Sequence, residues 1–420
     1  MNKLFTIFLL AFVANFVTAF AQSETPVVAS IDTIAPASID TIAPASIDTI
    51  APAAVATVAG VDEAQPEKPK GFFAKLKDYL SNKEVENKAG KGITWNFIGG
   101  PYYSSDTKFG IAITGAAYYR TDTTDLTLQP SFTSAYATVS TAKFWTVGLE
   151  GTAFFKRDTQ RLNYNASFGY SPRNYWGVGY EAGSLDDEYI NLKQYNAQIH
   201  AEYIMSFVPN FYFGPELEFN YFKANNKDLP EEALLQNDRT IRNYGLGVVL
   251  QYDNRDLITN ASRGVYAYFS AMFNPKFLWN KFAFTKINSS LRYYHTAWKY
   301  AIIAAQLQGE FTLGNPAWPN YAMMGGNSIM RGYYLGRYRY RHMWAAQVEI
   351  RQRIYGRNGI VVWGGVGNVF HDKNSFMKNL LPNYGIGYRF EFRKRMNIRL
   401  DLGFGKKGQM GVIFNMNEAF

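Results

Sequence analysis

The sequence predicts an all-β fold, a transmembrane antiparallel β-barrel of about 16 strands, from three observations. Apolar and polar residues alternate with period two from about Ile93 to Phe420. The alternating runs are close to the roughly 9–11 residues that a tilted membrane-spanning strand needs, and aromatic residues gather at their ends. The chain also begins with an apolar segment that is typical of an exported protein.

The composition agrees with a membrane barrel. Aromatic residues make up 17% of the 420 residues, with 30 Tyr, 32 Phe and 35 Gly, and the mean hydropathy is −0.22. In such a barrel, lipid-facing and lumen-facing residues alternate and average out. A soluble β-sandwich or propeller fits the composition and the alternation equally well, so the export segment, the strand lengths and the aromatic ends decide for the barrel.

Charge and reactive residues exclude several classes of function. The net charge of +9 is spread along the strand-like runs, so we expect no nucleic-acid binding. The absence of cysteine excludes a disulfide scaffold and a thiolate site. The four histidines lack the spacing of metal ligands, and no Gly-x-Ser-x-Gly elbow is present. We therefore expect no enzyme activity, no metal and no cofactor.

The first 92 residues divide into three segments. Residues 1–21 resemble a cleaved signal peptide, with Lys3, an apolar run and the small-residue site Ala19-Phe20-Ala21; the alternative is an uncleaved anchor. Residues 22–70 carry three tandem copies of "ASIDTIAP", which predict an extended linker. Residues 71–92 contain a short amphipathic helix, "GFFAKLKDYLSNK", and a connector.

Residues 93–420 form the barrel in this scheme. We place strands near 93, 107, 126, 142, 160, 188, 209, 241, 262, 281, 300, 343, 358, 383, 396 and 410. The long connections at 172–187, 225–240, 314–342 and 370–382 then share one side, the extracellular one, and the other connections are short periplasmic turns. The segment 174–183 is interpreted as a loop or as an extension of a strand outside the membrane.

The longest of these connections carries the most distinctive motif. It is glycine-rich and then dense in arginine and tyrosine, through "GGNSIMRGYYLGRYRYR", and a long irregular loop in an ordered domain is more often functional than not. Together with the strand that follows, this segment resembles the sixth extracellular loop of the Omp85 superfamily, the outer-membrane barrels of the BamA/TamA and bacterial surface antigen type. The residues that match the family loop are Gly325, Gly326, Met330, Arg331, Gly332 and Tyr333.

The resemblance implies a role for Arg331. In the family this arginine folds back into the lumen and pairs with acids on the following strands, and Glu349 matches one of them. The next strand departs from the family pattern, since Trp363 stands for a phenylalanine and Gly365 for an aspartate. A confined arginine needs compensation, so either Glu349 serves alone or another lumenal carboxylate helps it.

Two further segments match the family. The strand–turn–strand at "QYDNRDLITNASRG" resembles its periplasmic turn, with a structural role for Asp253, Arg255, Asp256 and Gly264. The end of the chain resembles the C-terminal targeting signal of outer-membrane barrels, which the assembly machinery reads. Its matching positions are Gln409, Gly411, Phe414, Met416 and Phe420.

The resemblance implies a protein that assists the insertion or assembly of outer-membrane proteins through a seam between the first and last strands, 93–103 and 410–419. Residues 22–92 do not fit a POTRA domain, because a folded domain needs ~50 residues or more with a core, and much of this stretch is the Ala-Pro repeat. The alternatives are a protein-secretion or solute channel and a structural subunit of an envelope complex. We expect the Gram-negative outer membrane, with a periplasmic linker, and as partners its lipids and nascent outer-membrane proteins or complex subunits.

Overall fold

The computed structural model describes residues 93–420, except 123, 125–127, 129, 226–238, 259 and 394. The expected signal peptide, repeat linker and amphipathic helix, residues 1–92, lie outside the described residues. No helix in the described part of the chain is long and apolar enough to cross a membrane.

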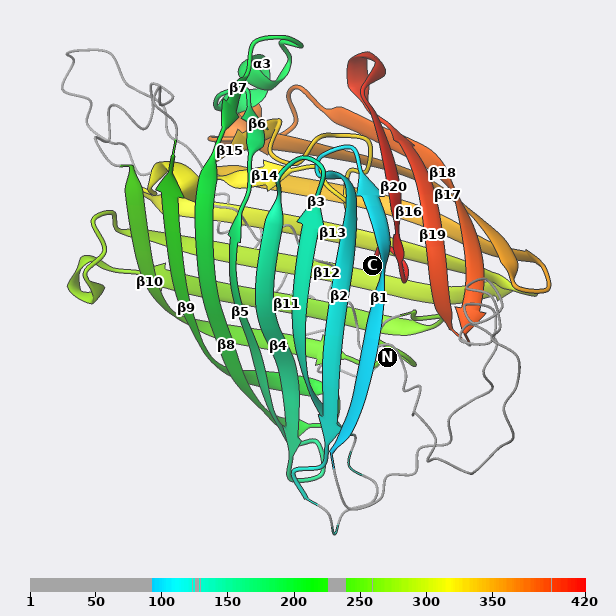
Figure 1. Cartoon of the computed structure of the whole chain (residues 1–420). Helices are drawn as coiled ribbons and strands as arrows, with labels where there is room; N and C mark the ends of the chain where they lie inside the picture. Colours follow the sequence, from blue (N-terminus) through cyan, green and yellow to red (C-terminus); the bar gives the residue numbers. More distant parts are fainter. Residues whose placement is uncertain are drawn as a thin grey trace, which may run out of the picture.

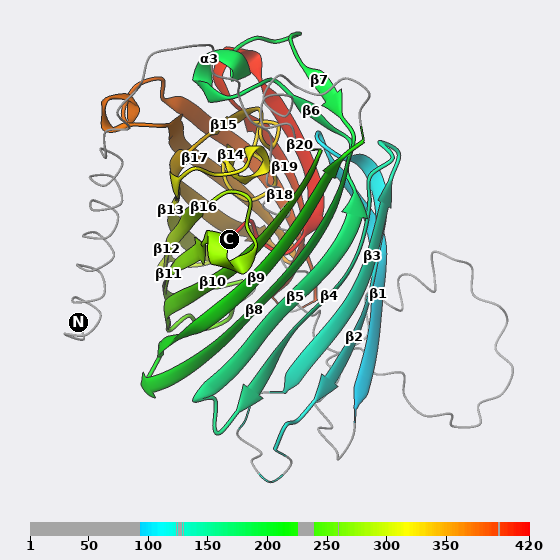
Figure 2. The same ribbon diagram turned by 90° about the vertical axis from the view of Figure 1, so that its left-hand side faces the viewer.

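Sixteen antiparallel strands close into a barrel in which each strand pairs with its neighbour along the chain and the last pairs with the first (Figures 1 and 2). This confirms the fold and the strand number that the alternation predicts. The barrel strands are β1 Thr94–Ser104, β2 Lys108–Tyr119, β3 Ser131–Ser140, β4 Trp145–Phe155, β5 Gln160–Tyr170, β8 Gln194–Val208, β9 Phe211–Ala224, β10 Thr240–Asp253, β11 Gly264–Asn274, β12 Phe284–Trp298, β13 Ala301–Gly314, β16 His342–Tyr355, β17 Asn358–Phe370, β18 Leu381–Arg393, β19 Met396–Phe404 and β20 Met410–Met416.

The alternation works because opposite faces of each strand meet opposite solvents. On β18, Tyr384, Ile386 and Tyr388 are exposed on the outer wall, at 57%, 50% and 45%. Arg389, the next residue, is 4% exposed and lies in the lumen. The interior of the barrel is therefore polar and its outer wall apolar, the reverse of a soluble domain.

The connections differ in length at the two ends of the barrel. The end that carries 171–193, 225–239, 315–341 and 371–380 is called the loop end here, and the other the turn end. The prediction of short turns at the second end is wrong in two places. Residues 120–130 and 254–263 each form a longer connection, and the third strand begins at Ser131 rather than near 126.

Several small elements are not part of the barrel wall. At the loop end, the segment 174–183 is neither a barrel strand nor a plain loop, since β6 Arg173–Tyr175 pairs with β7 Ile190–Leu192 beside helix α3 Gly179–Gly183 (Figure 2). A second hairpin, β14 Ala322–Met324 with β15 Tyr338–Tyr340, belongs to the connection 315–341. The 3-10 turns are η2 Lys276–Leu278, η3 Trp318–Asn320, η4 Lys373–Ser375 and η5 Lys406–Gly408.

Candidate functional site: the inserted loop and the seam

The connection 315–341, called the inserted loop below, packs against the lumenal wall. Its β14–β15 hairpin contacts β16 and β17. Its tip is buried, with Met330 and Arg331 at 0% exposure and Tyr333 at 2%. Met330 adopts a left-handed backbone with φ +54°, which is uncommon for a residue with a side chain and occurs mainly where the surroundings enforce it.

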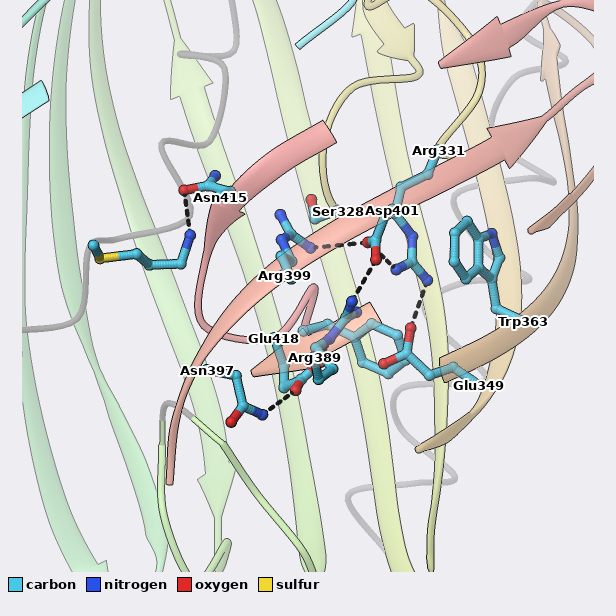
Figure 3. A network of polar contacts seen from close by, with 12 residues as sticks. Ser328, Arg331, Glu349, Trp363, Arg389, Asn397, Arg399, Asp401, Asn415 and Glu418 are labelled. Carbon is cyan, nitrogen blue, oxygen red and sulfur yellow. Dashed lines mark hydrogen bonds and ion pairs between the residues drawn. The ribbon is translucent and has the colours of Figure 1, made fainter. Parts of the chain in front are cut away.

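Arg331 lies between two carboxylates and an aromatic ring (Figure 3). Its Nη2 is 2.5 Å from Oε2 of Glu349 on β16, and its Nη1 is 2.8 Å from Oδ2 of Asp401 on β19. The guanidinium stacks on Trp363 of β17, with Cζ 3.7 Å from the ring centroid. Three strands thus hold one arginine of the loop, and both acids are fully buried.

The departures from the family pattern therefore have a structural explanation. Asp401 supplies the second acid from β19, whereas the family pattern has its aspartate at the position of Gly365 on β17. Trp363 fits because an indole is the strongest aromatic partner for a cation. Its Nε1 also donates to Oδ1 of Asn383, 3.0 Å away, which fixes the ring beneath Arg331.

The ion pairs continue from this centre toward the end of the chain. Arg351 donates to Glu349 at 2.6 Å, and Arg389 donates to Asp401 at 2.5 Å. Arg389 also lies 2.7 Å from Glu418, just beyond β20. Removing one member leaves its partners charged in a low-dielectric interior, so such networks fix one geometry more than they add stability. This network joins the inserted loop, strands β16, β18 and β19, and Glu418 just beyond β20.

Paired glycines let the loop approach β19 and β20. Gly403 and Gly411 are cross-strand partners. A Cβ on Gly403 would lie 2.4 Å from the Arg331 carbonyl oxygen, and a Cβ on Gly411 would lie 3.0 Å from Cα of Gly332. Gly332 has φ +116°, which only glycine adopts readily. Arg331 and Gly332 of the motif can therefore pack here only because Gly403 and Gly411 have no side chains.

The segment of the proposed targeting signal lies at the seam. Gly411, Phe414 and Met416 are in β20, and Gln409 precedes it and donates to the hydroxyl of Tyr338 at 3.0 Å. Phe420 is 7% exposed and packs in the lumen with Tyr294. Arg351 donates to its carbonyl oxygen at 2.8 Å. The C-terminus therefore lies within the outline of the barrel (Figure 1).

The proposed periplasmic turn lies at the turn end. Arg255 binds both carboxylate oxygens of Asp253, at 2.9 and 2.8 Å. Burial would raise the pKa of Asp256, but hydrogen bonds from Ser262 and Arg395 outweigh it and hold that pKa well below its usual value. Arg395 belongs to the β18–β19 turn, so this ion pair of 2.7 Å joins two turns that are distant in the sequence. Gly264 has φ +113° at the start of β11.

The seam is the weakest junction of the barrel. β1 pairs with β2 over eleven residues and β19 with β20 over seven, but β1 pairs with β20 only at Tyr103 and Ser104. The backbone of β1 from Thr94 to Tyr102 has no ladder partner on β20. The loop touches both sides of this junction: Gly332 lies on β20, and the Leu335 amide donates to Oδ2 of Asp106, 3.0 Å away in the β1–β2 turn.

Comparisons place this architecture in a family. The model of the Omp85 superfamily domain matches residues 89–420. Among solved structures, BamA from Haemophilus ducreyi lacking POTRA domains 1–3 is 12% identical with a TM-score of 0.54, covering 78% of this chain and 70% of that one. CdiB from Acinetobacter baumannii is 10% identical with a TM-score of 0.51, covering 78% and 60%. CdiB from Escherichia coli is 8% identical with a TM-score of 0.51, covering 78% and 62%.

At these identities the solved structures support the fold alone, and the chain spans less than two thirds of either CdiB. A search of curated protein sequences gives no match. The family model spans the whole barrel, including the inserted loop and the seam. The chain therefore belongs to the Omp85 superfamily, the outer-membrane barrels of protein insertion and secretion.

Proposed function

We propose that this protein assists the insertion of outer-membrane β-barrel proteins, in the manner of BamA and TamA, by parting β1 from β20. The proposal rests on the length of the ladder at the seam. Two residue pairs join β1 to β20, whereas every other junction of the barrel has seven pairs or more. Lipid cannot satisfy the backbone groups that lose a partner, so the cost of opening a junction rises with its number of ladder pairs. A junction of two pairs is therefore the place where the barrel opens at the lowest cost.

The exposed edge provides the chemistry of insertion. The stretch Thr94–Tyr102 pairs with β2 on one edge and makes no ladder pair with β20 on the other, and a strand edge outside a ladder is a template for an incoming strand. A strand of a nascent outer-membrane protein would pair there by β-augmentation, with the backbone giving affinity and little demand on sequence. No bond-making step is needed, and we expect no enzyme activity.

The inserted loop would hold the rest of the wall in shape while the seam parts. Arg331 fixes β16 and β19 through Glu349 and Asp401. The contact between Leu335 and Asp106 is the loop's hydrogen bond to the β1 side. Opening therefore requires loss of this bond, of the bond from the Val412 amide to Oγ of Ser105 at 3.0 Å, and of the two ladder pairs, while the ion network remains on the β20 side.

Secretion of a protein client remains the second candidate, because the same family includes both activities. An open solute channel fits less well, since the inserted loop and the network around Arg331 occupy the lumen beside β16–β20. An accessory role in an envelope complex makes no use of the short seam.

A disulfide lock tests the proposal. The chain has no cysteine, so Ser104→Cys with Ile413→Cys, a register pair, places a single bond across the seam. Ser290→Cys with Gln308→Cys locks β12 to β13 and serves as the control. In cells depleted of the native protein, the control lock should restore the outer-membrane proteome, and the seam lock should restore it only under reducing conditions.

The pattern of loss separates the candidates. Depletion of many barrel proteins supports insertion, and loss of one exported protein supports secretion. Full function of the oxidised seam lock would contradict a mechanism that needs β1 and β20 to part.

A further inference from the structure

A second polar cluster lies in the lumen on strands β8 and β9, apart from the Arg331 network. The register pairs Glu202 with Glu216 and His200 with Glu218. His200 Nε2 is 3.2 Å from Oε2 of Glu216 and 3.8 Å from Oε1 of Glu202. One ligand atom from each of these three residues lies within 4.8 Å of the other two.

These separations match a metal-coordination sphere. Bonds of about 2.0–2.1 Å in a tetrahedral site place the ligand atoms about 3.3 Å apart. The His200–Glu216 separation of 3.2 Å is close to that spacing, and the other two, 3.8 Å and at most 4.8 Å, would shorten around a bound ion. One imidazole with two carboxylates suits Zn²⁺ and similar transition metals, whereas Ca²⁺ and Mg²⁺ prefer oxygen ligands alone.

The carboxylate of Glu216 is only partly compensated, because His200 pairs with its Oε2 alone. Glu216 is 2% exposed, and its Oε1 has no hydrogen-bond partner among the described residues. A buried anion without full compensation is costly. The neighbouring cation, Lys286, is engaged with Glu310 at 2.7 Å, and Glu202 faces Glu216 directly across the ladder, where like charges repel.

The surroundings resemble the support of a metal ligand. Tyr268 donates its hydroxyl proton to Oε1 of Glu202 at 2.8 Å, and Asn163 donates to Oε2 at 3.2 Å, as outer-shell groups orient ligating carboxylates. On the other side lies a lumenal cavity of about 430 Å³, lined by His200 and Glu216 among others. A fourth coordination position facing this cavity would be open to water or to a small ligand.

We propose that His200, Glu202 and Glu216 bind a divalent transition metal of the Zn²⁺ class in the lumen, with an open coordination position toward the cavity. The site joins β8 to β9 on their lumenal face. The spacing of histidines along the chain gives no sign of it, because strand register, rather than a local motif, brings the three ligands together.

Metal titration of the full-length protein in detergent tests the site. Isothermal titration with Zn²⁺ should show one equivalent bound with a Kd in the micromolar range or below. Glu216→Gln and His200→Gln should each weaken binding by about 10- to 100-fold. Asn288→Ala, at an uncharged polar residue that lines the same cavity, should change the Kd less than about threefold.

Two further readouts keep a folding defect from imitating the result. Co²⁺ should give visible absorption bands of low-coordinate geometry in the native protein and lose them in Glu216→Gln. Zn²⁺ should raise the thermal midpoint of the native protein and of Asn288→Ala, but not that of Glu216→Gln. Absence of binding up to about 1 mM Zn²⁺, or binding that both ligand variants leave unchanged, would overturn the proposal.

Discussion

Replacing Arg331 with methionine should release the inserted loop from the wall. The change removes the positive charge that lies 2.5 Å from Glu349 and 2.8 Å from Asp401. Glu349 keeps Arg351, and Asp401 keeps Arg389 and Arg399, so the loss corresponds to one broken buried pair rather than two. Breaking such a pair costs about 3–5 kcal/mol. At about 1.4 kcal/mol per factor of ten, undocking of the loop becomes roughly a hundred- to a few-thousand-fold more frequent.

A single cysteine reports this undocking. The native chain has none, so Ile329→Cys, at a position 5% exposed on the loop, gives one thiol that a maleimide reaches only when the loop leaves the wall. With Arg331 present the labelling should be slow. In the Arg331→Met background its rate should rise by the factor above, until reaction with the free thiol becomes limiting.

Arg341→Met is the matched control, because Arg341 is only partly buried and donates to the Gly314 carbonyl at the end of β13 rather than to the ion network. It should leave the labelling rate unchanged. A labelling rate in Arg331→Met within threefold of the native background would refute the view that these ion pairs hold the loop.

Three other changes test parts of the site. Gly411→Val should displace the inserted loop, because a Cβ there already meets Gly332 at 3.0 Å, and the reporter thiol should label at least tenfold faster while the barrel still forms by circular dichroism. Trp363→Leu should weaken docking by about 1–2 kcal/mol from the lost cation–π contact, and Trp363→Phe by less, in the same labelling assay. Burial raises the pKa of Asp106 to about 6. The stability that its protonated form contributes is therefore present below about pH 4 and is lost as the pH rises through 6. Asp106→Asn should flatten this pH dependence of the thermal unfolding midpoint.

The barrel itself could be predicted from local pattern. The alternation that places Tyr384 and Ile386 outside and Arg389 inside is fixed by the period of a strand, and the number of strands follows from counting such runs. The family motif also directs attention to Arg331 and Glu349, which lie in one ion pair.

The remaining partners depend on closure of the sheet. Asp401 lies 70 residues after Arg331, and only the stagger of sixteen strands decides which lumenal carboxylate reaches the loop. The same holds for Glu418, which reaches Arg389 because the chain turns inward after β20. In "NIRLDLGFG", the alternation places Asp401 on the polar face of its strand. No feature of the sequence links that face to Arg331.

Hydrogen–deuterium exchange of the barrel in lipid nanodiscs tests the seam most directly. From Thr94 to Tyr102, β1 pairs with β2 along one edge. Along its other edge this stretch makes no ladder pair with β20. The account predicts that about half of the β1 amides exchange at least a hundredfold faster than those of β13, Ala301–Gly314, which is paired on both edges. Protection along the whole of β1 equal to that of β13 would contradict a barrel that opens between its first and last strands.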